Sequence, residues 1–501
     1  MADILVPEQV EIKDIITKKH NFSPANYKKV DVKAPNQVKL HNLLDSDVPF
    51  IRGTEPGSSA YLKDLKSNMK FIRNSCVDKL NNIVQLQRSL YLNEKSTTFN
   101  QEQLLQNGDI VVATEANIGD SALFHTDEKK YSYLLSSGMV KLNINKNVNK
   151  YYLLAMLEDG YFFSQLDSMT PKGSTIRHSG SRLLDCRIPY PKEKDLWIIP
   201  IIENLMRNII FAEKRAQKIQ DEITYIFDGE FRCISVNEKE PKVSDLLSVK
   251  RVDAGYYSQK VQRFFEKIEK HPNGSKKLAE LGYKTRRGPN LAKRDLGRSI
   301  KTDIFHPNYA LLVYPSDISD FGIIDKTTFL GAAGKIWYLE EKDILFSAEG
   351  NVGKTFAICD NSLKFTTNFH GIIITPINKD KVDIQHTIFI STFLNYMKRK
   401  GIIDKLSVGG QGGSFAVQYW DMLRFPNLND DILTKIKKLY YSRYQIYPFD
   451  FNEEDIDKLG IYEVNKLRTL CVSLLKVMLN DIKNDKIKEK SFYLKQLEQL
   501  I

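Results

Sequence analysis

An internal repeat constrains the fold of this chain more than any other feature of its sequence. The segment GDIVVATEANIGDS, residues 108–121, aligns without a gap on KDILFSAEGNVGKT, residues 342–355. Self-similarity of this kind identifies duplicated structural units. We therefore expect two similar domains in tandem. The matched positions include Glu115 with Glu349, Asn117 with Asn351, and Gly119 with Gly353.

Two further features recur in the same order around the aligned segments. Arg52-Gly53 corresponds to Arg287-Gly288, and the Gly/Ser-rich stretch that opens residues 171–191 corresponds to the one that opens residues 409–426. Each copy consists of short apolar runs separated by Gly, Asn and Asp turns, with a few helical stretches. This pattern predicts an α+β fold with two tandem α/β domains, rather than a regular alternation of strands and helices.

A long helix is expected after each copy. From Ile198 to Ile226 the apolar residues follow a 4-3 spacing, which keeps one stripe of a helix against a partner helix, as in a coiled coil. Gly229 stands where a C-terminal cap belongs. After the second copy, Asn429 begins a candidate helix, and residues 464–478 carry a similar stripe. We expect long, antiparallel, coiled-coil-like helices that separate the domains; the alternative is the buried core of one helical domain.

The repeats and the helices divide the chain into six segments, and its 501 residues exceed what one hydrophobic core usually contains. We expect an N-terminal arm (1–35), a first repeat domain (36–192), a central spacer helix (193–230), a linker (231–248), a second repeat domain (249–427) and C-terminal spacer helices (428–501).

The segment AEGNVGKT, residues 348–355, resembles the sequence pattern of a phosphate-binding loop. Such a loop needs a helix directly after it, because the helix N-terminus and the backbone N–H groups hold the phosphates. The residues that follow are rich in turn and strand formers, and the other copy has Asp120 in place of Lys354. We interpret the shared part as a tight turn in which asparagine and glycine take left-handed conformations. Lys354 is then a contact of the second repeat alone, to DNA phosphate.

Composition and motifs favour a binding protein over an enzyme. The net charge of +11 favours a polyanionic partner, while the five separated cysteines match neither a zinc site nor a disulfide framework. The sequence contains no HExxH, GxSxG or GxGxxG motif, and no tetrad or cofactor loop of amino-methyltransferases. No leader and no membrane-spanning stretch is found, so we expect a cytoplasmic protein without metal or catalytic residues.

Positive charge is concentrated in residues 283–301, where Asp295 is the single acid. Glycine and proline exclude one continuous helix, so we expect a projecting loop. Lysine and arginine neutralise phosphates, and arginine can also bind guanine in the major groove. In the first repeat the related position is Arg52. The predicted contacts of this basic segment are Lys284, Arg286, Arg287, Lys293, Arg294, Arg298 and Lys301.

The Gly/Ser-rich loops form a second candidate DNA surface, because their mixed donors suit phosphates and base edges. The alternative is an ordinary flexible loop, but both repeats place such a loop before a similar apolar segment that ends in proline. The predicted contacts of the first loop are Lys172, Ser174, Thr175, Arg177, His178, Ser181 and Arg182, those of the second are Gln411 and Ser414, and Asn117, Asn351 and Lys354 join them from the shared turn.

With these features the chain resembles the specificity subunit of type I restriction-modification systems, which has two target recognition domains. Residues 251–268, RVDAGYYSQKVQRFFEKI, are similar to the segment that opens such a domain, and FSPANYKKV at residues 22–30 is its expected counterpart in the first repeat. The resemblance implies that each domain reads one half of a bipartite site in double-stranded DNA. It implies further that the helices set the spacing and dock two DNA adenine methyltransferase subunits, which restriction/translocase subunits join.

The same resemblance implies a non-catalytic chain without a cofactor, because S-adenosylmethionine, ATP and Mg²⁺ belong to the partner subunits. Two features depart from the family: residues 188–197, IPYPKEKDLW, lack the usual exit motif, and Pro448 interrupts the C-terminal helices. Three alternatives remain: a type IIB-like or other phage-defence modification complex, a nucleotide-binding enzyme using Ala348 to Thr355, and a protein-binding scaffold. The helix side chains expected to serve subunit docking are Ile202, Leu205, Ile209, Ile219, Ile223, Leu467 and Leu474.

Overall fold

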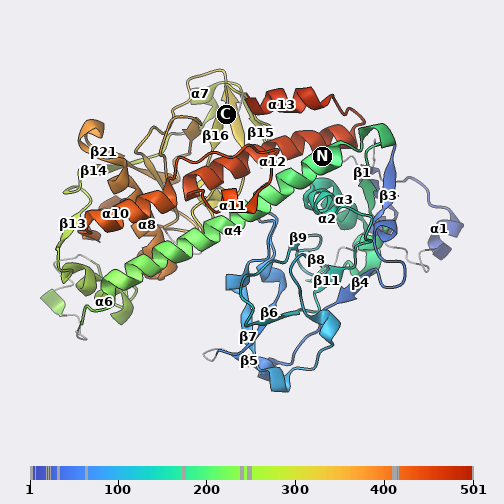
Figure 1. Cartoon of the computed structure of the whole chain (residues 1–501), viewed down its shortest axis with the longest axis horizontal. Coiled ribbons are helices and arrows are strands. Elements are labelled where there is room, and N and C mark those ends of the chain that lie inside the picture. The colour runs from blue at the N-terminus through green and yellow to red at the C-terminus, as the bar shows by residue number, and fades with distance from the viewer. Residues whose placement is uncertain are drawn as a thin grey trace. The chain divides into compact units, whose positions relative to one another are not determined.

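The structure is a computed structural model of the chain, and it divides into two compact units (Figure 1). Unit 1 comprises Met1–Glu213, Phe449–Phe451 and Leu474–Gln496, and unit 2 comprises Lys214–Pro448, Asn452–Ser473 and Leu497–Ile501. The structure describes residues 4–498 except 6, 18–19, 21, 23, 31–33, 63–65, 172–175, 237–241, 245–250, 409–413 and 416.

Unit 1 is built on two four-stranded sheets and a two-stranded sheet. The first sheet is antiparallel, in the order β4 (Phe50–Arg52), β11 (Met139–Leu142), β8 (Ile110–Ala113), β9 (Ser121–Leu123). The second has the order β10 (Ser132–Leu135), β6 (Met69–Ile72), β7 (Leu90–Leu92), β5 (Tyr61–Leu62), and its β10–β6 pair is parallel. Strand β3 (Gln37–Lys39) pairs with β12 (Arg187–Pro189), and β1 (Ile4–Leu5) with β2 (Lys29–Val30).

Unit 2 repeats this topology strand for strand, from the counterpart of β3 to that of β12. Its first sheet has the order β14 (Tyr283–Arg287), β21 (Gly371–Pro376), β18 (Ile344–Ser347), β19 (Thr355–Ala357). Its second has the order β15 (Ser299–Thr302), β17 (Phe329–Ala332), β16 (Ala310–Leu312), β20 (Phe365–Thr366), and β16–β20 is the parallel pair. Strand β13 (Ser275–Lys277) pairs with β22 (Arg424–Pro426). The predicted duplication and the α+β fold are confirmed.

Corresponding helices pack on corresponding strands in the two units. In unit 1, Asn149 caps α2 (Lys150–Glu158), which packs on β9. In unit 2, Asp383 caps α8 (Ile384–Arg399), which packs on β19. Both caps accept backbone N–H groups of the first turn, which fixes where each helix begins. Further helices are α1 (Ile12–Thr17) and α3 (Gly160–Met169) in unit 1, and α6 (Gln259–Glu269), α7 (Lys293–Leu296), α9 (Ile402–Leu406), α10 (Asp430–Tyr440) and α11 (Glu453–Ile456) in unit 2.

The long helix expected after the first copy is α4, Ile198–Phe231, which is continuous over 34 residues. It extends beyond Gly229, so that glycine is not the C-terminal cap that the sequence suggested. The second copy is followed by α10, then by α12 (Ile461–Lys483) and α13 (Lys490–Glu498). Boundaries between the two units fall within α4, α12 and α13.

The apolar stripe of these helices is buried within the chain itself. All seven side chains assigned to subunit docking are at most 4% exposed. Their burial follows from the heptad spacing, which places them on one face of each helix. A partner subunit would have to dock on the exposed faces instead. These side chains are Ile202, Leu205, Ile209, Ile219, Ile223, Leu467 and Leu474.

Candidate nucleic-acid interface

The recurring Arg-Gly pairs lie at the ends of the edge strands β4 and β14. A Cβ atom on Gly53 would lie 2.2 Å from the backbone oxygen of Ser136, and one on Gly288 would lie 2.1 Å from that of Asn368. Only glycine permits such a close approach of two backbones. The glycine therefore brings each strand end against a neighbouring turn, and it places the preceding arginine beside the loop that follows β8 or β18.

Replacing either glycine by alanine should destabilise its unit. The added methyl group would overlap with backbone atoms, and overpacking of this kind costs about 1–3 kcal/mol. We expect Gly53→Ala and Gly288→Ala to lower the midpoint of thermal unfolding by several degrees, measured by circular dichroism. Gly57→Ala is the matched control, because a Cβ there would meet only the Ser59 hydroxyl, at 3.9 Å. Equal midpoints for all three variants would contradict the assigned role.

In each unit the arginine pairs with the glutamate that the repeat alignment matched. Arg52 Nη2 pairs with Glu115 Oε1, and Arg52 Nε donates to the backbone oxygen of Ser137 at 2.8 Å. In unit 2, Arg287 Nη1 lies 3.3 Å from Glu349 Oε1. The glutamates lie in equivalent loops, two residues after the last residue of β8 and of β18.

A histidine completes the cluster in both units, but it comes from different parts of the chain. His178 Nδ1 lies 3.3 Å from Glu115 Oε1, and His178 belongs to the Gly/Ser-rich loop. His370 Nδ1 contacts Glu349 Oε2, and His370 directly precedes β21. We call each set an Arg–Glu–His cluster; its side chains are between 22% and 58% exposed. The clusters are Arg52, Glu115 and His178 in unit 1, and Arg287, Glu349 and His370 in unit 2.

Backbone contacts bring the Gly/Ser-rich loop of each unit to the same place. Glu115 forms an isolated β-bridge with His178, and Glu349 forms one with Ser414. In unit 1, Ala116 N also donates to the backbone oxygen of Arg177 at 3.0 Å. The structure thus brings together residues that the sequence placed in separate candidate surfaces.

The other residues predicted in the first Gly/Ser-rich loop differ in their contacts within the chain. Arg177 is held by α3, because its Nη1 donates to Asp167 at 2.6 Å. Arg182 donates to the backbone oxygen of Ser179 at 3.2 Å, whereas Ser181 is exposed. Within the chain, Arg177 acts as an anchor of the loop rather than as an unengaged DNA contact. Lys172, Ser174, Thr175 and Gln411 lie outside the described residues.

The segment AEGNVGKT is the turn of a β-hairpin. Strand β18 pairs antiparallel with β19, which begins at Thr355, so no helix follows the loop, and a phosphate-binding loop is excluded. Gly353 and its counterpart Gly119 have φ of 98° and 85°, as expected. The second left-handed position is Gly350 or Ala116, one residue before the expected asparagine. Asn351 and Asn117 are exposed.

Lys354 does not fit the predicted contact with DNA phosphate. Its residue is only 7% exposed, and its Nζ atom lies 3.1 Å from Asp320 Oδ1. In unit 1 the corresponding Asp120 is 5% exposed; burial raises the pKa of this carboxyl to about 6, and the nearby charge of Lys79 opposes the rise. Lys79 and Asp320 occupy corresponding positions, because each lies three residues after a short 3-10 helix. These helices are Asn74–Cys76 in unit 1 and Pro315–Asp317 in unit 2. The two repeats therefore hold opposite charges at the same pair of positions.

The basic segment is not the single projecting loop that its glycine and proline suggested. Its two ends are the edge strands β14 and β15 of two different sheets, and α7 lies between them. Arg286 stacks on Trp337, with 3.8 Å from the guanidinium carbon to the ring centre, and burial lowers the pKa of Arg286. Exposed cations nevertheless dominate the segment: Lys284, Arg287, Lys293, Arg294, Arg298 and Lys301.

Comparison with known proteins gives a match over the first repeat. Residues 48–221 match the family model described as the type I restriction modification DNA specificity domain. The first repeat is therefore similar to a type I restriction-modification DNA specificity domain. The family resemblance inferred from the sequence is thereby confirmed, and all three members of the first Arg–Glu–His cluster lie within the matched residues. A search of curated proteins found no match.

Solved structures similar to this chain include two specificity subunits. One is the S subunit of a type I restriction-modification system from M. genitalium, with 12% identity, a TM-score of 0.35, and coverage of 93% of this chain and 96% of that chain. Another is the HsdS subunit from Thermoanaerobacter tengcongensis, with 11% identity, a TM-score of 0.28, and coverage of 90% and 97%. A third, on assembly of the type I R-M system, has 12% identity, a TM-score of 0.28, and coverage of 92% and 100%.

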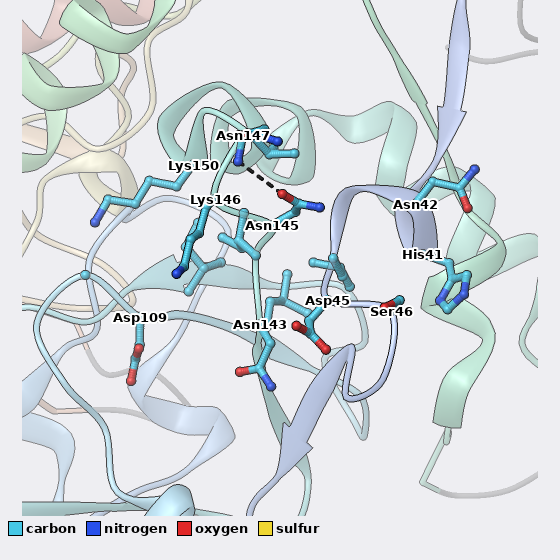
Figure 2. A pocket seen from close by; sticks show the side chains of 16 residues that line it. His41, Asn42, Asp45, Ser46, Asp109, Asn143, Asn145, Lys146, Asn147 and Lys150 are labelled. Atoms are coloured by element: carbon cyan, nitrogen blue, oxygen red, sulfur yellow. Dashed lines mark hydrogen bonds between the residues drawn. The ribbon is translucent and has the colours of Figure 1, made fainter.

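The first repeat also contains a polar pocket of about 1090 Å³, at the ends of β8 and β11 that lie opposite the Arg–Glu–His cluster (Figure 2). Leu142, at the end of β11, and Ile110, at the start of β8, line it, whereas the Arg–Glu–His cluster lies beyond Ala113. Its charged groups balance, since two aspartates, Asp45 and Asp109, accompany two lysines. The pocket therefore lacks the excess of positive charge that binding to phosphates requires.

Among the described residues, no group of three histidine, cysteine or acidic side chains is placed to hold a metal ion. No helix in the same part of the chain is both long and apolar enough to cross a membrane.

Proposed function

We propose that this chain is the DNA sequence-specificity subunit of a type I restriction-modification complex, and that each repeat reads one half of a bipartite site. The observation that carries the proposal is the duplication. The matched specificity domain and the second repeat have the same strand order, and both hold an Arg–Glu–His cluster at the same end of the first sheet. Two equivalent readers in one chain suit a site with two halves.

The chemistry of the exposed side chains supports contact with DNA. Arginine binds phosphates and guanine, and the exposed lysines and arginines of residues 283–301 add phosphate contacts in the second repeat. The second repeat carries more exposed positive charge in this region than the first, which supports the recognition of different half-sites by the two repeats. Helix α4, with 34 residues, is about 51 Å long and exceeds one turn of B-DNA, which supports a role in setting the distance between half-sites.

In this proposal the chain performs no catalysis, and its partners supply the chemistry. Two DNA adenine methyltransferase subunits would bring S-adenosylmethionine, and restriction/translocase subunits would bring ATP and Mg²⁺. Docking would use exposed helix faces, since the heptad stripe is already buried. The complex would work in the cytoplasm.

Methylome sequencing tests the proposal most directly. A strain that carries the gene together with its methyltransferase partner should show methyladenine in one bipartite motif. Deleting this gene alone should remove the methylation of that motif, and restoring the gene should restore it. An unchanged methylome after deletion would contradict the proposed function.

A further inference from the structure

We propose that Glu115 and Glu349 are specificity-determining residues, and that each accepts a hydrogen bond from the exocyclic amino group of a cytosine or an adenine in its half-site. This inference rests on the proposed function, and it assigns a role within it to two residues that the sequence alone left without one. An ionised carboxylate only accepts hydrogen bonds, and amino groups of these two bases are the donors that the major groove offers.

The carboxylates retain the capacity to accept another hydrogen bond. In unit 1, Arg52 and His178 both contact Oε1 of Glu115. Among the described residues, none donates a hydrogen bond or forms an ion pair with Oε2 of Glu115. In unit 2, Glu349 receives Arg287 on Oε1 and His370 on Oε2, and a carboxylate has about four acceptor positions in total. Both groups are also accessible, with side chains 22% and 38% exposed.

Structural stability is a weak reason for these clusters. Exposed ion pairs contribute about 0–1 kcal/mol, and the arginines here are 55% and 40% exposed. A negative charge on a surface that faces phosphates would also oppose DNA binding by Coulombic repulsion. A glutamate at the same place in both repeats therefore needs a reason that outweighs this cost, and recognition of a base supplies one.

The histidines strengthen this reasoning, because the two units obtain them from different segments. His178 occupies the position that Ser414 holds in unit 2, and His370 directly precedes β21 at the position where the first repeat has Gly138, directly before β11. In each unit the carboxylate is thus contacted by an arginine at an equivalent position and by an imidazole that comes from a different segment of the chain. Such support fixes the carboxylate in one orientation and offsets part of its charge, which are the requirements of a group that reads a base edge near phosphates.

A bipartite motif provides an internal control for the test. Glu115→Gln and Glu349→Gln preserve the size of the side chain, but each replaces an acceptor-only group by an amide that also donates. We expect Glu115→Gln to relax or change the preference at one base pair of one half-site. Glu349→Gln should do the same in the other half alone. Discrimination at the affected position should fall by about 10-fold or more.

The measurement is methylome sequencing of strains that carry each variant in the complete system, with Glu102→Gln and Glu280→Gln as controls. Both control residues are exposed glutamates, one in each unit, outside the clusters. If a variant abolishes methylation, selection of bound duplexes from a randomised library by the purified complex, together with its thermal unfolding, shows whether recognition or folding was lost.

Three outcomes are distinguishable. An altered preference confined to a different half for each variant supports the inference. Unchanged motifs in both variants, or changes spread over both halves, would overturn it while leaving the proposed function intact. Absence of any bipartite motif in the wild-type strain would instead remove the proposed function itself.

Discussion

Reversing the charge of Lys354 should destabilise unit 2 by about 3 kcal/mol, at the low end of the cost of breaking a buried ion pair. Lys354→Asp would place a second carboxylate beside Asp320 in a position where the native residue is 7% exposed. The low end applies because the Asp320 side chain is 46% exposed and keeps part of its hydration. The free energy of unfolding can be measured in urea and monitored through tryptophan fluorescence, since Trp337 and Trp420 lie in unit 2.

A second substitution should restore most of this loss. The first repeat shows that the same site accepts the opposite polarity, with Lys79 near Asp120. We therefore expect Asp320→Lys combined with Lys354→Asp to recover at least about 2 kcal/mol of the unfolding free energy, a coupling within the range measured for contacting residues. Lys335→Asp, an equal charge change at an exposed site, should cost about 0.5 kcal/mol or less. A double variant as unstable as the single one would show that charge complementarity is not what this pair supplies.

Removing three exposed charges from the basic segment should weaken DNA binding by about 100-fold or more at ~0.1 M salt. The variant is Lys284→Gln, Lys293→Gln and Arg298→Gln combined. Each phosphate contact contributes about −0.9 to the slope of log affinity against log salt concentration, so the slope should become shallower by about 2 to 3. Fluorescence anisotropy of a labelled duplex, titrated with the purified complex over a potassium chloride series, measures both quantities.

The matched control removes three charges elsewhere in the same unit. Lys435→Gln, Lys437→Gln and Lys438→Gln change α10, which is not part of the basic segment. This control should alter the salt slope by much less than the basic-segment variant. Equal changes in slope for the two triple variants would mean that binding responds to net charge alone, and that residues 283–301 make no direct contact with phosphates.

The duplication made much of the fold predictable. A gap-free match of GDIVVATEANIGDS with KDILFSAEGNVGKT required equivalent strands and turns, and the recurring Arg-Gly pairs marked the close contacts at Gly53 and Gly288. Hydrophobic periodicity likewise predicted α4 and its buried stripe. These features depend on local sequence and on backbone geometry, and both can be read from one chain.

Long-range pairing explains what the sequence did not reveal. The sequence alignment matched Glu115 with Glu349, but nothing in it connected either glutamate to a histidine, because His178 and His370 come from positions that do not align. Lys354 looked available until the fold brought Asp320 beside it. The basic segment looked like a loop because charged residues on edge strands hide the alternation that identifies a strand.

Unit 1 is assembled from separate parts of the chain, and this restricts how such repeats can be exchanged between genes. Unit 1 is completed by residues from the far end of the chain: Asn204 donates to the backbone oxygen of Phe449 at 2.6 Å, and Trp197 packs against Tyr493. A gene fragment that encodes only the first repeat and α4 would leave these partners behind. Recombination that transplants this repeat into another chain must therefore find matching C-terminal helices in the recipient, so the two copies share a topology without being interchangeable cassettes.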